Sequence, residues 1–376
     1  MKEGWDYIDF KDVFPVKMGK TPPRGDKSSW DEKKETHNKW VSIADISNNE
    51  GKIIEDTKEY ISDSAASKIN KVNKGSLLMS FKLSIGRMAF AGDDLYTNEA
   101  IIAIPESDKY ILRFMYYYLL SYNWLSLTEG NEKVKGATLN KTSIGKIQLP
   151  VIPLFEQQSI VDYLDSAFAK IDAMKANAEK ALNEAKALFQ ASLKEMLEPK
   201  EGWEVMKLGE FAYMKAGNFV KASEIFSDYK EGLYSCYGGN GFRGYVKEPN
   251  QDGDYCMIGR QGALCGCVNR AQGVFRTTEH AVIVKPYKDI PTSLVYYMLV
   301  NLNLNKYATG AAQPGLSVNN IAEAVTISVP PYENQQSIAE TLDSLKSKVD
   351  RLQENFDKIS QECDALKQAI LRQVFE

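Results

Sequence analysis

Two stretches of the chain repeat apolar residues at a seven-residue spacing over about five heptads, a pattern typical of a coiled coil. In the later stretch, the a and d positions from Ile338 to Ile370 are apolar, and Asp, Glu, Lys and Gln cover the other faces. The earlier stretch, from Ile160 to Ser192, follows the same spacing with many alanines. Small side chains on one helix and bulky ones on the other predict that the two helices pack closely together.

Each predicted helix begins beside a proline, which is tolerated in a first helical turn, and Pro199 ends the first helix. A helix of about 40 residues is about 60 Å long, so an antiparallel pair would hold two heads at a fixed separation. The predicted seam of this pair consists of the larger apolar a and d residues, namely Ile160, Leu164, Ile171, Met174, Leu188, Ile338, Leu342, Leu345, Val349, Leu352, Phe356, Ile359, Leu366 and Ile370.

The rest of the chain alternates short apolar runs with glycine-rich turns. Residues 100–104 and 281–285 are rich in β-branched side chains and are followed by prolines, so we expect strands there. Short helices are expected at 110–122 and 293–302, and the glycine-rich stretch YGGNGFRGY predicts a tight turn. The expected fold class is therefore α+β.

The chain repeats itself once. EGWDYIDFKDVFPVKMG, ending at Gly19, runs parallel to EGWEVMKLGEFAYMKAG, ending at Gly217, and the later matches LYTNEAIIAIP and FRTTEHAVIVKP align Glu99 with Glu279. The same order in both halves indicates an internal duplication. We expect two similar globular domains separated by two long antiparallel coiled-coil helices: domains at 1–152 and 200–329, helices at 153–199 and 330–376.

Composition narrows the class of protein. A chain of 376 residues is too long for one ordinary domain, and its net charge of −4 argues only mildly against nucleic-acid binding, which depends on where basic groups lie. Five cysteines without an apolar leader predict reduced thiols in a cytoplasmic protein, and no apolar run predicts a membrane span. The cysteine spacing favours free thiols over a zinc site.

Several partial motifs fall short of a catalytic site. Gly19-Lys20-Thr21 lacks the upstream glycine of a P-loop, and two prolines follow it. Val329-Pro330-Pro331-Tyr332 lacks the polar residue that amino-methyltransferases place before their prolines. The two histidines, His37 and His280, occur in no metal-ligand spacing, and a structural role is the default for His280. We expect no catalytic residue and no metal in this chain.

The segment P-x-x-x-Q-Q-x-I opens both heptad stretches, as Pro153–Ile160 and Pro331–Ile338. With the Gly-Trp pair before each domain and Gly-Lys-Thr-Pro at 19–22, this layout resembles the specificity subunit of type I restriction–modification enzymes over the whole chain. One departure is Asn334, which stands where the first copy has Glu156.

The resemblance implies a non-catalytic subunit that reads double-stranded DNA. Each domain would read one half of a split, asymmetric site, and the helices would set the spacer, with half-sites about 34–36 Å apart. Two modification subunits, carrying S-adenosylmethionine, would dock on the chain, and restriction subunits, using ATP and Mg²⁺, would join them. No cofactor is expected in this chain itself.

Base and phosphate contacts require Lys, Arg, Asn, Gln and closely approaching backbone. The first domain offers a loop at 20–24, a segment at 82–87 and a glycine-flanked loop at 133–135; the second offers YGGNGFRG, GRQG and TGAAQPG. The DNA-binding residues predicted from these loops are Lys20, Thr21, Arg24, Lys82, Arg87, Lys133, Lys135, Tyr237, Asn240, Arg243, Arg260, Gln261 and Gln313.

Two alternatives to a DNA-specificity subunit stay open at this point. The chain could be an enzyme with degenerate motifs, or a coiled-coil scaffold that binds proteins without reading DNA; the scaffold predicts no salt-sensitive DNA binding. The paired glutamines Gln157, Gln158, Gln335 and Gln336 either orient the helix starts or touch the modification subunit, and the sequence does not decide between these roles.

Overall fold

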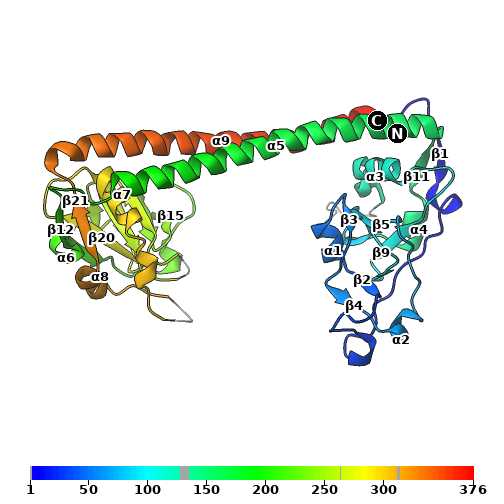
Figure 1. Ribbon diagram of the computed structural model, residues 1–376, viewed down its shortest axis with the longest axis horizontal. Helices are drawn as coiled ribbons and strands as arrows, with labels where there is room; N and C mark the ends of the chain where they lie inside the picture. Colours follow the sequence, from blue (N-terminus) through cyan, green and yellow to red (C-terminus); the bar gives the residue numbers. More distant parts are fainter. Residues whose placement is uncertain (1, 128–134, 263, 311–313) are drawn as a thin grey trace. The chain divides into compact units, whose positions relative to one another are not determined.

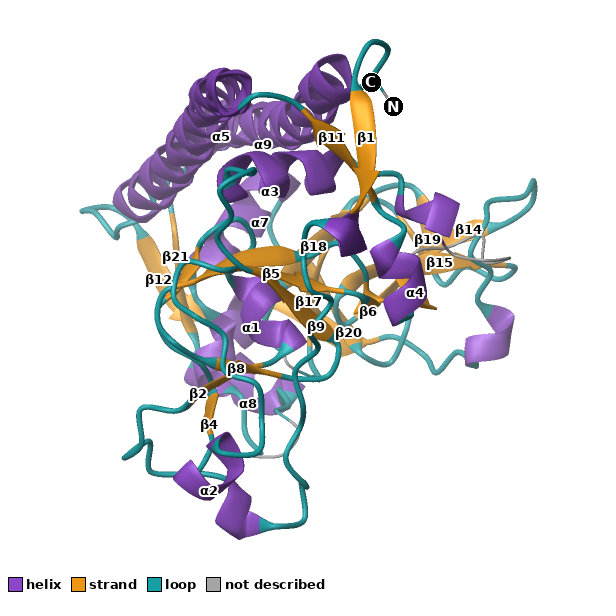
Figure 2. Ribbon diagram, turned by 90° about the vertical axis from the view of Figure 1, so that its right-hand side faces the viewer, coloured by secondary structure: helices purple, strands orange, loops and turns teal. Residues whose placement is uncertain are grey.

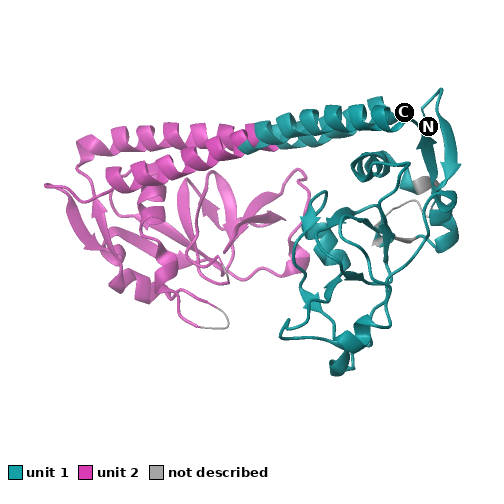
Figure 3. Cartoon of the chain, turned by 45° about the vertical axis from the view of Figure 1, so that its right-hand side comes forward, with its two compact units in different colours: residues 1–176, 358–376 teal, residues 177–357 magenta. Residues whose placement is uncertain are grey.

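The computed structural model describes residues 2–127, 135–262, 264–310 and 314–376, and combines helices with small sheets (Figure 1). The chain divides into two compact units (Figure 3): Met1–Ala176 with Lys358–Glu376, and Asn177–Asp357. The long helices α5 (Leu154–Met196) and α9 (Tyr332–Phe375) each contribute to both units. Within the described residues, no helix has both the length and the apolar character that a membrane crossing needs.

The first unit contains a sheet in the order β3-β7-β5-β9, a smaller sheet β4-β2-β8, and the pairs β1-β11 and β6-β10. Figure 2 shows the pair β1-β11 beside the long helices. Its main core lies between β5, β9 and the aromatic helix α3, whose Phe114 and Tyr117 are buried. The elements of this unit are β1 Asp6–Asp9, β2 Lys39–Val41, α1 Ile43–Asn48, β3 Ile53–Ile54, β4 Glu59–Tyr60, α2 Asp63–Ala66, β5 Leu77–Ser80, β6 Lys82–Ser84, β7 Met88–Ala91, β8 Tyr96–Thr97, β9 Ile101–Ile104, α3 Leu112–Ser121, β10 Lys135–Thr138, α4 Lys141–Gly145 and β11 Gln148–Val151.

The second unit contains sheets in the orders β13-β20-β17-β18 and β15-β14-β19-β16, and the pair β12-β21. Leu294 and Met298 of helix α7 are buried in a core with β17 and β20. The elements of this unit are β12 Glu204–Lys207, α6 Leu208–Phe211, β13 Ala212–Ala216, β14 Tyr234–Gly238, β15 Gly241–Val246, β16 Gln251–Asp252, β17 Tyr255–Gly259, β18 Val268–Ala271, β19 Val274–Thr277, β20 Ala281–Pro286, α7 Thr292–Asn301, α8 Val318–Ala324 and β21 Thr326–Val329.

The two units repeat one backbone register, which confirms the predicted duplication. Ser80 of β5 pairs with Ile101 of β9, and Gly259 of β17 pairs with Ala281 of β20. The next hydrogen bond is also the same in both units. The Phe81 amide, just after β5, donates to the Ala100 carbonyl, just before β9, at 2.9 Å; the Arg260 amide, just after β17, donates to the His280 carbonyl, just before β20, at 3.0 Å. This register places Glu99 and Glu279 at equivalent positions, as the sequence alignment predicted.

A glycine holds the same close approach in each unit. A Cβ on Gly19 would lie 2.0 Å from the carbonyl oxygen of Thr97, and a Cβ on Gly217 would lie 2.2 Å from that of Thr277. The two glycine amides donate to the carbonyls of Ile101 and Ala281, at 3.3 Å and 3.0 Å. A side chain does not fit at either position, so the crossing of these two segments depends on glycine.

Helices α5 and α9 lie side by side and antiparallel within each unit (Figure 1). In the first unit Lys175 forms an ion pair with Asp364 at 3.4 Å, and Lys367 forms one with Asp172. In the second unit the Lys186 Nζ donates to Gln353 at 2.7 Å. In an antiparallel pair, contacting residues in one register have a constant sum of residue numbers. The three pairs named here have the same sum, so the register of α5 against α9 is the same in both units.

The seam of this pair differs from the predicted one at one of its two heptad positions. The position of Leu164, Ile171, Leu342 and Val349 is buried as expected. At the other position, the residue one step later along the helix is more buried than the predicted one at several places. Phe189 is buried while the predicted Leu188 is 64% exposed, and Lys175 is half-buried while the predicted Met174 is 58% exposed.

The same shift occurs in α9. Leu366 and Leu352 are exposed, and the half-buried Lys367 and Gln353 take the places next to the partner helix. Ile160, Ile338, Leu345, Phe356, Ile359 and Ile370 of the predicted seam are half-buried. A lysine fits the seam because its stem packs against apolar neighbours while its ammonium reaches a carboxylate on the other helix.

The structure separates the roles of the paired glutamines. Gln157 and Gln335 are buried, and each donates to a carbonyl just before its helix, Ile152 and Pro330 respectively, at 3.0 Å. Gln158 and Gln336 are exposed and bond carboxylates one turn later on the same helix. The first glutamine of each pair therefore orients the helix start.

Candidate nucleic-acid interface

Three loops of the second unit meet at one place: the turn between β14 and β15, the end of β17, and the segment between β19 and β20. A Cβ on Gly239 would lie 3.1 Å from the carbonyl oxygen of His280 and 3.6 Å from that of Gln261. A Cβ on Gly238 would lie 2.4 Å from Cδ of Arg243 and 3.3 Å from Oγ1 of Thr278. The backbone of the glycine turn thus passes directly against the other two loops.

Charged and polar side chains gather at this meeting point, which we name the second-unit loop site: Arg243, Arg260, Arg276, Thr278, Glu279 and His280. Burial raises the pKa of the neighbouring Cys236 thiol; the charges of Arg243 and Arg276 oppose this rise, and that of Glu279 adds to it. These charges therefore lie close to one buried thiol. His280 Nε2 lies 3.0 Å from Glu279 Oε1.

Buried polar atoms at the second-unit loop site have no hydrogen-bond partner among the described residues. They are Nε of Arg260, Nε of Arg276, Oγ1 of Thr278, Oε2 of Glu279 and Nδ1 of His280. Unpartnered buried polar groups are uncommon in folded proteins and call for a physical reason. Five such atoms lie where three loops converge, which makes this place a candidate binding surface.

The sequence-predicted residues of the second unit fall into three groups. Asn240 is exposed on the turn, Arg243 is exposed on β15, and Arg260 and Gln261 are half-buried beside them, so the fold brings these four together. Tyr237 packs instead against Phe242 and Phe275, with ring centroids 5.9 Å and 5.6 Å away. Gln313 lies outside the described residues.

The equivalent place in the first unit holds Lys20, Thr21, Lys82 and Glu99. The Thr21 hydroxyl donates to Glu99 Oε2. This hydrogen bond holds the pKa of Glu99 below its usual value, with a smaller contribution from the Lys82 charge. Lys20 is exposed, and its amide bonds the Thr97 carbonyl at 2.8 Å. We name these four residues the first-unit loop site.

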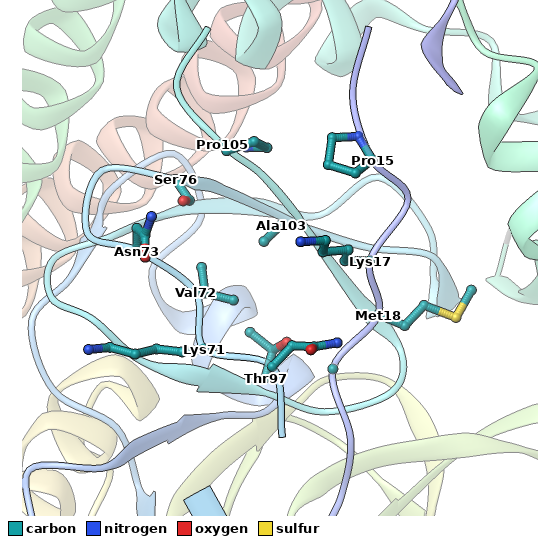
Figure 4. Close-up of a pocket in the computed structure, with 12 residues that line it drawn as sticks. Pro15, Lys17, Met18, Lys71, Val72, Asn73, Ser76, Thr97, Ala103 and Pro105 are labelled. Atoms are coloured by element: carbon teal, nitrogen blue, oxygen red, sulfur yellow. The ribbon is translucent and has the colours of Figure 1, made fainter. Parts of the chain in front are cut away.

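The segment that carries Lys20 runs along β9 beside a pocket of about 130 Å³ (Figure 4). Pro15, Lys17 and Met18 line one side of this pocket, opposite Lys71 and Val72. Met18 pairs with Ile102 of β9 as an isolated bridge. This pairing and the Gly19 crossing bring the following residues, Lys20 and Thr21, to the first-unit loop site.

Arg24 and Arg87 are held by carboxylates elsewhere in the first unit. Arg24 binds both oxygens of Glu59 and lies over the rings of Trp30 and Trp40, with its Cζ 4.1 Å and 4.8 Å from their centroids. Arg24, Trp30 and Glu59 line an open pocket of about 400 Å³. Arg87 forms an ion pair with Glu50.

The remaining first-unit candidates are described only in part. The backbone of Lys135 pairs with Ser84 as β10 joins β6, which places this strand next to Lys82. Lys133 lies outside the described residues. Among the residues that the structure does describe, no three His, Cys, Asp or Glu side chains gather as metal ligands, and the five cysteines are free.

Sequence reasoning missed Glu99, Glu279 and His280. A signal was present, because the duplication aligned the two glutamates, and each one stands two residues before a strand. The sequence gives no indication that His280 Nε2 contacts the carboxylate of its neighbour, and a histidine beside a strand was assigned a structural role.

Comparison with known proteins decides the family. The model of the type I restriction modification DNA specificity domain matches this chain twice, over residues 2–184 and 200–361. The chain belongs to this family. The two family matches correspond to the two copies of the register described above, so the duplication and the family assignment agree.

Relatives of the type I specificity family extend over most of the chain. The specificity subunit of the type I restriction enzyme EcoprrI from Escherichia coli is 32% identical over 354 residues, which are 90% of this chain and 86% of that protein. The specificity subunit of the MjaIX enzyme from Methanocaldococcus jannaschii is 23% identical over 243 residues, 59% of this chain and 55% of that protein.

Solved structures share the fold. One chain, from a study of complex assembly and conformational transition in a type I restriction–modification system, has a TM-score of 0.79 at 18% identity and covers 100% of this chain and 98% of its own. The HsdS subunit from Thermoanaerobacter tengcongensis has a TM-score of 0.57 at 17% identity, covering 100% and 97%. These identities establish the fold and nothing finer.

Proposed function

We propose that this chain is the DNA-specificity subunit of a type I restriction–modification complex, and that each unit reads one half of a split, asymmetric site in double-stranded DNA. The observation that carries the proposal is one backbone register used twice with different side chains at its loops. Phe81 and Lys82 follow β5, whereas Arg260 and Gln261 follow β17. Two copies of one frame with unlike reading residues fit two unlike half-sites.

The chemistry of the loop sites supports DNA readout. Arg and Gln read base edges in the major groove, and Arg, Lys and backbone amides hold phosphates. Arg243 on β15, Arg260 after β17 and Arg276 on β19 lie in or beside the three segments that meet at the second-unit loop site, although the whole chain has a net charge of −4. Local concentration of positive charge, rather than the sum over the chain, decides whether a polyanion binds.

The paired helices supply a surface for modification subunits. Met174 and Leu366 in the first unit, and Leu188 and Leu352 in the second, are apolar and exposed. Each of them sits one residue before a seam position, so within each unit the two residues lie on the same side of the antiparallel pair. An exposed apolar stripe favours a protein partner, and two such stretches fit two modification subunits. The helices also set the unread spacer between half-sites.

Catalysis belongs to the partners in this proposal. The modification subunits carry S-adenosylmethionine and methylate adenine, and the restriction subunits use ATP and Mg²⁺. The chain itself contributes binding and positioning, and no group of it enters the methyl transfer.

The test is co-expression with the modification subunit from the same source, followed by mapping of methylated adenines across a genome. A split motif with two unlike halves is the expected result. A continuous motif would mean that only one unit reads DNA. An intact complex without any methylation would favour the protein-binding scaffold.

A further inference from the structure

Glu279 is the residue at the second-unit loop site that the proposed function leaves without a role. A carboxylate repels phosphate, so its place among arginines on a DNA-facing surface needs its own explanation. Its Oε1 lies 3.0 Å from Nε2 of His280, and its buried Oε2 has no partner among the described residues. An ionised carboxylate only accepts hydrogen bonds, so the missing partner is a donor.

The first unit explains why this oxygen is free. Glu99, at the equivalent position, accepts from the Thr21 hydroxyl. The residue equivalent to Thr21 is Phe219, because Lys20 and Asn218 make the same backbone bond, to the carbonyls of Thr97 and Thr277. Phe219 has no hydroxyl and is 68% exposed. The second unit therefore has the carboxylate acceptor without the hydroxyl donor that the first unit provides.

The available donors in DNA are few. In the major groove, cytosine presents its N4 amino group and adenine its N6 amino group, whereas the O6 and N7 of guanine and the O4 of thymine are acceptors. The Glu279 side chain is 30% exposed, and the terminal torsion of a glutamate is soft, so a small rotation turns Oε2 outward. The nearby arginines offset the repulsion between this carboxylate and the DNA backbone.

We propose that Glu279 determines specificity in the second unit by accepting a hydrogen bond from the exocyclic amino group of a cytosine or an adenine. The inference rests on the proposed function, because it takes double-stranded DNA as the partner. His280, whose Nε2 contacts Oε1 in the free chain, acts as a positioning residue that keeps the Glu279 side chain at the loop site. Guanine and thymine at the same position would place an acceptor against the carboxylate and be rejected.

The experiment uses the chain in complex with its modification subunit and a duplex that carries the mapped site. At each position of the second half-site, the amino group is removed by replacing cytosine with 2-pyrimidinone or adenine with purine, and the Kd is measured. The wild-type complex should lose affinity by roughly tenfold at one position, within the range for a specific base contact. The substitution that causes the loss identifies the base.

The Glu279→Ala complex should show no such loss at that position, since the acceptor has gone. Glu248→Ala is the matched control: it removes the same charge from an exposed site in the same unit and should keep the wild-type pattern. Glu279→Gln, which keeps the shape of the side chain, serves if Glu279→Ala does not assemble, and should weaken the discrimination.

Two results would overturn the inference while leaving the proposed function standing. One is a wild-type complex that reads a split site but tolerates every amino-group removal in the second half. The other is a loss of equal size in wild type and Glu279→Ala. A wild-type complex that binds all sequences equally would overturn both proposals.

Discussion

The two loop sites differ in how their polar groups are satisfied, although their backbones share one register. In the first unit Glu99 is bonded internally by Thr21; in the second Glu279 and the surrounding arginines keep unpartnered atoms. The conserved part of the duplication is thus a set of backbone bonds and glycine crossings, and the variable part is the side chains that these bonds present. Substitutions in the shared backbone frame should therefore have larger effects than substitutions that change only the side chains of one loop site.

The largest loss of stability is expected at the two glycines where backbone segments cross most closely. Gly217→Ala would place a Cβ 2.2 Å from the carbonyl oxygen of Thr277, and Gly19→Ala would place one 2.0 Å from that of Thr97. Because backbone has to move at both sites, each substitution should destabilise its unit by about 3 kcal/mol. Gly25→Ala is the control, since a Cβ there meets nothing within 4 Å. Thermal unfolding of the three variants measures this, and equal midpoints would refute the argument.

The next largest loss of stability should distinguish the starts of helices α5 and α9. Gln157 bonds the carbonyls of Lys109 and Ile152 and accepts from the Ile111 amide at 2.9 Å. Gln335 keeps only the bond to Pro330, and its Oε1 has no partner among the described residues. The reason is local: Pro291 stands before α7 where Ile111 stands before α3, and proline has no amide proton.

Gln157→Ala should accordingly cost about 3 kcal/mol, and Gln335→Ala about 1 kcal/mol, at roughly 1 kcal/mol for each hydrogen bond. Urea unfolding of the two variants gives the comparison. A Gln335→Ala variant that loses as much as Gln157→Ala would show that the two starts are equivalent despite the proline.

Much of this frame was predictable from the sequence, because duplication and heptad spacing both depend on regular patterns. The seam between α5 and α9 shows a feature that sequence patterns did not predict. Heptad reasoning chose Met174 and Leu188 because they are apolar, yet the structure turns Lys175 and Phe189 toward α9. Adjacent apolar residues such as Leu188 and Phe189 leave the phase of the helix undecided, and a lysine in the seam depends on a carboxylate that lies far along the chain.

The loop sites were predictable only in part for a related reason. Composition pointed to Arg243 and Arg260, since glycine-flanked basic residues are common in DNA-binding loops. It also pointed to Arg87, which the fold pairs with Glu50. Which cations are neutralised internally, and which carboxylates are left without a donor, depends on contacts between distant segments, and the local sequence does not encode these contacts.

A smaller effect should follow from making the two loop sites alike. Phe219→Thr would give Glu279 the hydroxyl donor that Thr21 gives Glu99. The carboxylate would then be satisfied internally, and discrimination at its position in the second half-site should fall by several-fold, less than the roughly tenfold loss expected for removing the contact. Methylation mapping with Phe219→Thr measures this. An unchanged motif would mean that the introduced hydroxyl does not donate to Glu279. Phe219→Val is the control, because it removes the aromatic ring without adding a hydroxyl.

The smallest effect on stability is expected on the exposed side of the helix pair. Leu188 is 64% exposed, so Leu188→Gln should change the free energy of unfolding by no more than about 0.5 kcal/mol. The same substitution at the buried neighbour, Phe189→Gln, should destabilise the second unit strongly, because Phe189 packs in its core.

The two neighbours also differ in what they should do to the complex. If the exposed stripe binds a modification subunit, Leu188→Gln should reduce co-purification of that subunit while leaving the thermal midpoint of the isolated chain unchanged. Leu352→Gln, on the other helix and the same side of the seam, should act in the same direction. A Leu188→Gln chain that retains its partner fully would mean that the stripe is not the docking surface, and that the seam shift has no consequence for assembly.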